Sequence, residues 1–323
     1  MNNIEREDKE LTYGIDLISV IIPTYNRKSY LVEAIDSVLK QNYSNIEILI
    51  VDDNSIDGTE ELIRDNYKNY DNIYYFKNNT NKGPGYNRLK GFNKSKGKYI
   101  VFLDDDDYYT DYNFFGDAIK KFNENSNLSF VSANNYIKKE GKDELIESIL
   151  NFNKKVTCVE YLNNFQTVKY PKPQSTFTTI FNKKILEDVN LNEVKMVNDT
   201  IIYLRALLGG NPEFIKNIVG VYRMHNNNIS KGCSSDFIIQ NLDEKYKIYN
   251  LARNMSDFRD KITENWLNEQ MFLTLDYYIY DSPTNFKDYM KIIKWINKNI
   301  KYKRYLQINN VIKRAIKKKY MSR

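Results

Sequence analysis

The stretch YIVFLDDDD, residues Tyr99–Asp107, places four consecutive aspartates directly after a short apolar run. The apolar part is rich in β-branched and aromatic side chains, which is typical of a strand in the core of a sheet. The four carboxylates repel one another, so they need either a cation or a solvated turn beside them. Taken alone, the stretch fits a charged surface turn as well as a binding edge.

The surrounding chain alternates apolar runs with helical patterns. Apolar runs typical of buried strands occupy residues 17–22, 46–51, 73–76 and 99–103, and amphipathic helical spacing occupies 29–40, 59–63 and 86–95. This alternation predicts an α/β fold, a Rossmann-like, mostly parallel central sheet with flanking helices. Polar residues follow three of the strands, at Thr24, Asp52 and Asp104. Because ligands bind beyond the carboxyl ends of such strands, we expect these positions to form one site.

The later part of the chain first continues this pattern and then changes. Helices are predicted at 114–122, 161–165 and 199–208, and strands at 128–133 and 218–222. From about residue 235 the pattern is helical throughout. We therefore expect a catalytic domain over 1–233 and a helical C-terminal region over 234–323.

Composition narrows the class of protein and its compartment. The 323 residues carry a net charge of +6, with 41% hydrophobic and 28% charged side chains, as in a globular protein. Two cysteines, Cys158 and Cys233, are too few for a disulfide framework. The first ten residues are polar, unlike a signal peptide, and no apolar run approaches the roughly 20 residues of a membrane span. These features predict a cytoplasmic protein.

The basic charge is concentrated at the end of the chain. Residues 289–323 contain twelve Lys and Arg and no acidic residue, and 302–323 has an apolar face. A basic amphipathic helix predicts peripheral contact with the inner face of the membrane. A solvated helix end or a dimer contact fits equally well. No nucleic-acid-binding module is recognisable, so we do not expect a nucleic-acid partner.

Four motifs in order connect the chain with a known family. They are VIIPTYNR at 20–27, VDDNSIDGT at 51–59, NKGPGYNR at 81–88 and the aspartate stretch at 99–107. With these motifs the chain resembles family 2 glycosyltransferases of the GT-A fold over residues 18–230. The resemblance implies transfer, with inversion, of a sugar from a nucleotide diphosphate. It also implies Mn²⁺ or Mg²⁺ at a DxD motif.

The resemblance assigns a nucleotide-binding group. Pro23, Thr24, Tyr25 and Asn26 match the segment around the nucleobase, with the Tyr25 ring suited to stacking. It further implies that Asp53 accepts a hydrogen bond from the base, that Asp52 holds the loop and that Arg88 approaches the nucleotide. Ordinary loop packing is the alternative for Pro23 and Tyr25.

Four consecutive aspartates leave the DxD register open, and the resemblance gives it: aligning Phe102-Leu103 with the apolar pair of the family makes Asp104 and Asp106 the two aspartates of the motif. Asp106 is then the first candidate for metal ligation. Asp104 is the candidate for the ribose, an outer-shell water or the metal itself. Asp105 takes the variable position, within the nucleotide-sugar group.

The resemblance also implies a catalytic base and groups near the departing diphosphate. Asp199 matches the base, whereas the acidic residue that precedes it in the family is Asn198 here. Capping of a helix is the alternative role of either residue. Arg223 and His225 match a segment that closes over the donor, which implies that His225 ligates the metal and Arg223 neutralises the diphosphate. The segment 172–176 lies where the family places acceptor-facing residues, although turn residues would look the same.

These features predict a metal-dependent inverting hexosyltransferase that takes a nucleotide-sugar donor, expected to be a UDP-sugar. The expected acceptor is a glycan or a lipid-linked glycan. A sugar-phosphate nucleotidyltransferase is one alternative, but it would usually carry a glycine-rich basic loop where residues 23–28 stand. A non-catalytic membrane-associated binding or scaffold protein with the same fold is the other.

Overall fold

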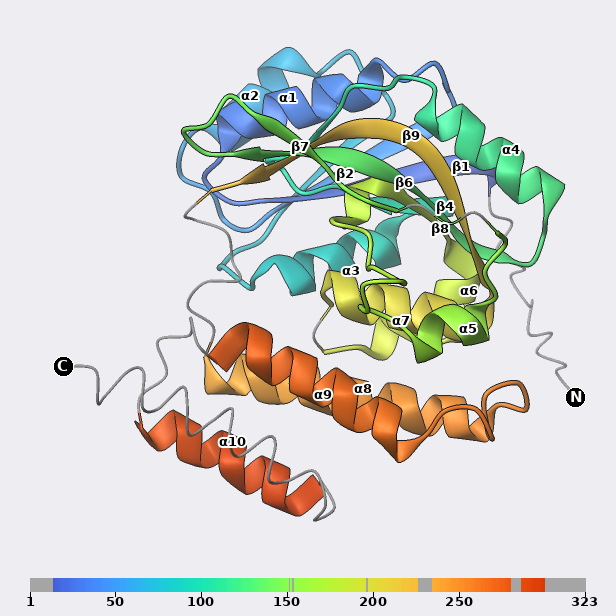
Figure 1. The fold of residues 1–323 in the computed structure, drawn as a ribbon. Coiled ribbons are helices and arrows are strands. Elements are labelled where there is room, and N and C mark those ends of the chain that lie inside the picture. The colour runs from blue at the N-terminus through green and yellow to red at the C-terminus, as the bar shows by residue number, and fades with distance from the viewer. Residues whose placement is uncertain are drawn as a thin grey trace, which may run out of the picture.

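The computed structural model describes residues 14–150, 152, 154–195, 197–225, 234–279 and 286–299. Within them, nine strands form one mixed sheet, with helices on both of its faces and three more helices stacked beyond one face (Figure 1). The strand order is β3-β2-β1-β4-β8-β6-β9-β5, and β7 pairs with β6. The predicted α/β class with flanking helices and a helical C-terminal part is confirmed.

The first half of the sheet is parallel, as the alternating pattern predicts. Its strands are β1 (Gly14–Thr24), β2 (Ile46–Asp52), β3 (Ile73–Lys77) and β4 (Gly97–Phe102). They are connected by α1 (Lys28–Leu39), α2 (Thr59–Asn66) and α3 (Pro84–Lys94). Every residue of β2 is buried, because helices cover both faces of a parallel sheet.

The second half of the sheet mixes directions. β8 (Thr179–Asn182) is antiparallel to both β4 and β6 (Leu128–Lys139), while β9 (Asn211–Met224) is parallel to β6. β5 (Tyr108–Tyr109) and β7 (Leu145–Glu147) add antiparallel pairs. The sequence predicts β6 and β9 but not β5, β7 or β8. Strands of two to four residues contain too few side chains for an apolar alternation to be recognised.

The sheet divides the hydrophobic core into two parts, and helices cover each of them. α1, α2 and α4 (Phe114–Glu124) cover one face (Figure 1). α3, α5 (Cys158–Asn163), α6 (Lys183–Asp188) and α7 (Asp199–Gly209) cover the other. The short 3-10 helices η1 (Thr176–Thr178) and η2 (Leu191–Glu193) complete this second layer. The predicted start of α7 at Asp199 matches the structure.

Three C-terminal helices extend the second core away from the sheet. α8 (Ser235–Asn254) and α9 (Glu264–Ile279) lie beyond α7 and α5, and α10 (Phe286–Asn299) lies beyond them (Figure 1). Buried residues of all three belong to the same hydrophobic cluster as α7. The indole of Trp266 donates to the carbonyl of Leu162 at 2.7 Å, and Arg205 pairs with Glu244 at 3.1 Å. The domain boundary at 233/234 stays a prediction.

The described helices include none with the length and apolar character needed to cross a lipid bilayer. The predicted membrane-contact segment, 302–323, lies outside the described residues.

A buried lysine in this helical layer yields a stability prediction. The Lys245 ammonium is buried and donates to the Gln270 carbonyl at 2.6 Å, and burial lowers its pKa from 10.5 to about 7. The unfolded chain therefore binds more protons than the folded chain between pH 7 and 10.5, so the free energy of unfolding should rise with pH over that window. Lys245→Met should flatten this rise and stabilise the protein at pH 7 by roughly 3 to 5 kcal/mol.

Urea unfolding at several pH values between 7 and 10 measures this difference. Lys294→Met, on the exposed side of α10, is the matched control and should change neither the stability nor its slope with pH. A variant at position 245 that keeps the wild-type slope would contradict the assignment.

Candidate functional site

The carboxyl ends of β1, β2 and β4 meet at one edge of the sheet, as predicted. The amide of Asp53 donates to the carbonyl of Thr24 at 2.9 Å, and the amide of Leu103 donates to the carbonyl of Ile21 at 3.0 Å. These bonds extend the parallel ladder to the last residue of each strand. The loops that follow therefore leave the sheet side by side.

Two of the loops are tied together by Asn26. Its backbone has a φ of +52°, a conformation that asparagine tolerates better than most residues. The Asn26 amide donates to Ser55 Oγ at 2.9 Å, and the Asn26 side-chain oxygen accepts from the Ile56 amide at 2.8 Å. Asp52 accepts from Ser55 and from the Tyr75 hydroxyl, which fits its predicted role in holding the loop. The loops at this edge are therefore fixed by the chain's own polar groups.

Asp53 holds the loop that leads into α3. It is buried, and its carboxylate accepts from the Asn78 side chain at 2.9 Å and from the amides of Lys82 and Gly83 at 2.7 Å each. A carboxylate has about four acceptor positions, so one more donor can still be accommodated. Next to it, Pro23 is buried in β1, while the Tyr25 side chain is 46% exposed. The exposed ring is open to stacking.

Each aspartate of the 104–107 stretch has its own partners. Asp104 pairs with Arg88 at 2.6 Å. Asp105 accepts from the Thr24 hydroxyl at 2.8 Å.

Arg27 connects the middle of the stretch. Its Nη1 lies 3.1 Å from Asp105 Oδ1 and 2.6 Å from Asp106 Oδ2. The same Asp106 oxygen lies 2.7 Å from His225 Nε2. Asp106 thus faces both the α1 side of the site and the end of β9.

Asp107, the last aspartate, joins distant parts of the fold. It accepts from Ser175 Oγ and from the Arg223 amide, each at 3.1 Å. The stretch is consequently anchored to β1, α3, β9 and the segment before η1.

The aspartate stretch contains more negative charge than its cations neutralise. Burial raises the pKa of Asp105 to about 7, despite the neighbouring Arg27. Burial also raises the pKa of Asp104, against the effect of Arg88, and raises that of Asp107, with a further contribution from Asp106 and Asp104. Added positive charge at this edge would stabilise the ionised forms.

Arg88 bridges the aspartate stretch to α7. Its Nη2 pairs with Asp104, and its Nη1 lies 3.1 Å from Asp199 Oδ1. Burial opposes the charge of Arg88, but the two carboxylates outweigh it and raise its pKa. The guanidinium can reach both because α3 packs closely on β1: a Cβ at Gly91 would lie 2.4 Å from Ile21 Cγ2.

Asp199 is the first residue of α7, and the residue before it caps the helix. The Asn198 side-chain oxygen accepts from the Ile201 amide at 3.0 Å. Asn198 therefore takes the capping role that the sequence leaves open, and the Asp199 carboxylate faces Arg88. Lys172 Nζ lies 3.9 Å from Asp199 Oδ2, and burial lowers the pKa of Lys172. The Lys172 ammonium also donates to the Pro173 carbonyl at 2.8 Å.

Arg223, at the end of β9, closes over the aspartate stretch. It donates from Nη1 to the Asp106 carbonyl at 2.9 Å and from Nη2 to Glu33 at 2.5 Å. Its guanidinium lies over the rings of Tyr108 and Tyr30, and the His225 ring is stacked with Tyr30. Two aromatic rings and one carboxylate thus hold Arg223 beside Asp106.

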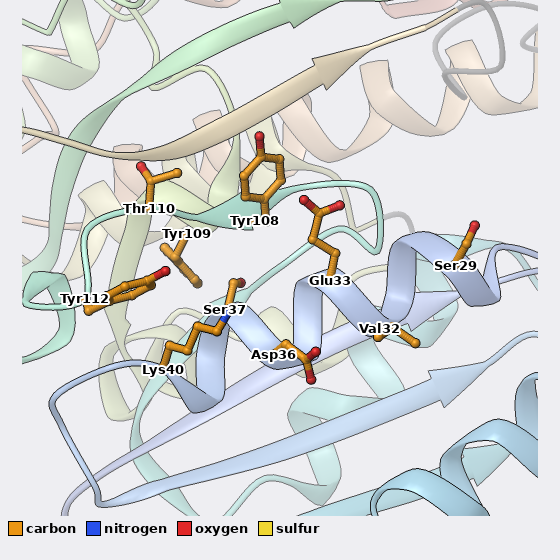
Figure 2. Close-up of a pocket in the computed structure, with 10 residues that line it drawn as sticks. All are labelled: Ser29, Val32, Glu33, Asp36, Ser37, Lys40, Tyr108, Tyr109, Thr110 and Tyr112. Carbon is orange, nitrogen blue, oxygen red and sulfur yellow. The ribbon is translucent and has the colours of Figure 1, made fainter.

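A hollow of about 340 Å³ lies between α1 and β5, on the other side of Glu33 and Tyr108 (Figure 2). Its wall contains residues of α1 and of the 108–112 segment, but none of the predicted site residues. The hollow shares Glu33 and Tyr108 with the contacts that hold Arg223, so it lies next to the edge where the aspartates meet.

The profile of the family described as "Glycosyl transferase family 2" matches residues 19–190, which is more than half of the chain. The chain belongs to glycosyl transferase family 2. A Campylobacter jejuni relative, GalNAc(5)-diNAcBac-PP-undecaprenol beta-1,3-glucosyltransferase, is 30% identical over 58% of this chain and 58% of its own. An Escherichia coli relative, UDP-Glc:alpha-D-GlcNAc-diphosphoundecaprenol beta-1,3-glucosyltransferase WfaP, is 37% identical over 39% of this chain and 49% of its own. The chain thus spans less than two thirds of either relative.

Solved structures show that this family 2 chain has the GT-A fold. S. aureus TarS 1-349 in complex with UDP-GlcNAc matches with a TM-score of 0.62 and 21% identity, over 93% of this chain and 81% of that one. The mannosyltransferase PcManGT from Pyrobaculum calidifontis, in complex with GDP-Man and Mn²⁺, matches with a TM-score of 0.54 and 15% identity, over 95% of this chain and 88% of that one. Because β9 and the C-terminal helices lie within the aligned part of the chain, the likeness extends beyond the family profile.

The residues of this family 2 site fit a divalent cation. Asp106 and His225 are adjacent, and Mg²⁺ or Mn²⁺ commonly takes one or two protein ligands together with phosphate oxygens and water. Burial raises the pKa of three of the four aspartates, and a bound cation would favour their ionised forms. Across the described residues no three His, Cys, Asp or Glu side chains converge, and Asp104 faces Arg88 instead. The structure thus brings together two of the three predicted metal ligands.

Several residues of the site were not among those predicted from the sequence. Arg27 contacts two of the four aspartates, Glu33 holds Arg223, and Ser175 holds Asp107. Arg27 follows directly on the polar residues at the end of β1, so its sequence position was a usable signal. Ser175 lies in the segment 172–176 that the sequence analysis singles out, although its contact with Asp107 was not predicted. Glu33 had no such signal, since it meets Arg223 through a contact between distant segments.

The Arg88 bridge yields a stability prediction for the site. Arg88→Met should leave the Asp104 and Asp199 carboxylates, which are 31% and 26% exposed, without their shared partner and lower the free energy of unfolding by about 2 kcal/mol at pH 8. The loss should be smaller at lower pH, because removing Arg88 takes away an interaction that lowers the pKa of Asp104, and protonation of Asp104 then removes the unpaired charge. Denaturant unfolding at pH 8 and at pH 5 measures the two losses.

Arg64→Met removes an exposed arginine on α2 and serves as the control, with an expected change within about 0.5 kcal/mol at either pH. Equal losses for Arg88→Met at pH 5 and pH 8 would contradict the charge argument.

Proposed function

We propose that this chain transfers a sugar, with inversion, from a UDP-sugar to a glycan or lipid-linked glycan, in a metal-dependent reaction. The observation that carries the proposal is that, in a family 2 chain, Asp106 lies beside His225 while Arg88 joins Asp104, from the same aspartate stretch, to Asp199. A carboxylate beside an imidazole could hold the cation that binds the diphosphate. A separate carboxylate at the start of a helix could remove the proton from an acceptor hydroxyl.

The donor nucleotide is proposed to lie across the ends of β1, β2 and β4. The exposed Tyr25 ring can stack on the base, and Asp53 has a remaining acceptor position for it. Asp104 is proposed to bind the ribose, and Asp106 and His225 would hold Mn²⁺ or Mg²⁺. When bound, the cation would neutralise charge on the diphosphate.

Asp199 is proposed as the general base. It would accept the proton of the acceptor hydroxyl as that oxygen forms its bond to the anomeric carbon. The bond from this carbon to the diphosphate breaks on the opposite face, and its electron pair leaves with the UDP. Arg223, held beside Asp106, is placed to stabilise the charge that develops on the departing diphosphate.

The acceptor class is supported by the relatives. The names of the Campylobacter and Escherichia coli proteins both specify an undecaprenol-linked diphosphate as the acceptor, and the second also specifies UDP-Glc as the donor. A lipid-linked acceptor agrees with the proposed location, the cytoplasmic face of the membrane, with contact through 302–323. TarS was solved with UDP-GlcNAc and PcManGT with GDP-Man, so both nucleotides belong in the test.

Turnover of nucleotide sugars by the purified chain tests the proposal. With Mn²⁺ present we expect slow hydrolysis of one UDP-sugar in a panel that also contains GDP-mannose. We expect faster release of UDP when an undecaprenol-linked glycan is added, and loss of both activities with EDTA.

Asp199→Asn should lower kcat by about 10² to 10⁴ while UDP binding is kept, because the carboxylate is needed for proton removal but not for the nucleotide.

Asp71→Asn, in an exposed loop, is the matched control and should retain wild-type kcat. Full activity of Asp199→Asn would remove Asp199 from the mechanism. Nucleotide binding without any turnover would favour the scaffold alternative.

Metal binding can be tested apart from turnover. Asp106→Ala removes the carboxylate next to His225 and should weaken Mn²⁺ binding by about 10-fold or more in an electron paramagnetic resonance titration with UDP present. Asp71→Ala should bind Mn²⁺ as the wild type does. Unchanged affinity in Asp106→Ala would place the cation elsewhere.

A further inference from the structure

The residue before Asp199 has two hydrogen-bonding roles. The Asn198 side-chain oxygen caps α7 through the Ile201 amide, as described above. The Asn198 side-chain nitrogen donates to the side-chain oxygen of Asn241. A single amide group therefore connects the start of α7 to α8, a helix of the C-terminal layer.

Asn241 is itself held firmly. Its side chain is 2% exposed, and its nitrogen donates to the Phe237 carbonyl at 3.0 Å, one turn earlier on α8. This bond directs the Asn241 oxygen toward Asn198. Three residues further along α8, Glu244 pairs with Arg205 of α7 at 3.1 Å, with side chains 2% and 4% exposed. α7 and α8 are thus in fixed register at two points.

The chemistry of position 198 follows from this arrangement. Either an acidic residue or an asparagine can cap the helix, since both supply an acceptor oxygen. Only the asparagine also supplies an N–H for the Asn241 oxygen. In the family that the chain resembles, an acidic residue precedes this aspartate. Its replacement here by Asn198 therefore fits the presence of Asn241 on α8.

We infer that Asn241 is a positioning residue for Asp199, and that α8 sets the start of the catalytic helix through the Asn241–Asn198 pair. The inference rests on the proposed role of Asp199 as base. Asp199 makes contacts at 3.1 Å with Arg88 and at 3.9 Å with Lys172, and both depend on where α7 begins. A small displacement of a catalytic group is costly in rate even when binding is intact.

The test separates rate from donor binding. Asn241→Leu replaces the amide by an apolar side chain of similar size and should lower kcat for sugar transfer about tenfold. The KM for the UDP-sugar and the affinity for UDP should change less than about twofold, because, in the part of the chain that the structure describes, α8 packs mainly on α7, α9 and α10. Asn250→Leu, at an exposed position of the same helix, is the matched control and should keep wild-type kcat.

A double-mutant cycle tests the pair itself. Asn198→Asp keeps the cap but places an acceptor against the Asn241 oxygen, so it should also lower kcat about tenfold. The double variant, Asn198→Asp with Asn241→Leu, should be no slower than either single variant, because the unfavourable contact is gone. If the losses in kcat of the two single variants multiply in the double variant, or if Asn241→Leu keeps the wild-type kcat, the inference is overturned.

Thermal unfolding of the same four proteins distinguishes this outcome from failure of the proposed function. If Asp199→Asn stays fully active, Asp199 is not the base. Non-additive changes in melting temperature would still show that Asn198 and Asn241 interact. Additive melting temperatures together with an inactive Asp199→Asn would overturn the positioning role alone.

Discussion

One buried guanidinium holds the site together. Arg88 lies between Asp104, which follows a strand, and Asp199, which begins a helix almost a hundred residues later in the chain. Two partly buried carboxylates this close would repel each other without a cation between them. The guanidinium also fixes their separation, because its planar fork presents Nη1 and Nη2 in set directions. The donor and acceptor sides of the proposed reaction therefore share one structural element, α3, whose close approach to β1 depends on Gly91.

Parallel topology explains why acidic groups gather here, and the loops explain how the chain tolerates them. Each strand ends at the same edge, so residues placed after β1, β2 and β4 become neighbours. Asp52 and Asp53 are satisfied by donors of their own and adjacent loops, which makes them supports for the backbone. Asp104 and Asp106 instead face arginines and a histidine, in a stretch where burial raises the pKa of the carboxylates. The difference between the carboxylates that support the loops and those proposed to bind the donor and the cation follows from these partners.

The sequence was informative where the signal was local or repeated. Runs such as 46–51 have enough consecutive apolar residues to define a buried strand, and the start of α7 at Asp199 was predicted to the residue. The four motifs indicated the family and the edge at which the site lies. The short strands β5 and β8 were missed because their pairing depends on distant partners rather than on their own pattern. Glu33 was missed for the same reason, and so were the contacts of Arg27 and Ser175, although both of these residues lie in segments that the sequence singles out.

The composition of α7 shows why the helical layer belongs to the architecture of the site. Residues 201–208 of this helix are all buried, and seven of the eight are apolar. A helix that is apolar on all sides must be covered on all sides, and the sheet can cover only one of them. α8 covers another, and the hydrophobic cluster runs without a break from Ile21 in β1 through α7 to Ile296 in α10. The one charged residue in this stretch, Arg205, is matched by Glu244 of α8, which fixes the register as well as the contact. The predicted boundary at 233/234 follows the change in the sequence pattern, and buried residues from both sides of it belong to the hydrophobic cluster that surrounds the helix beginning with Asp199.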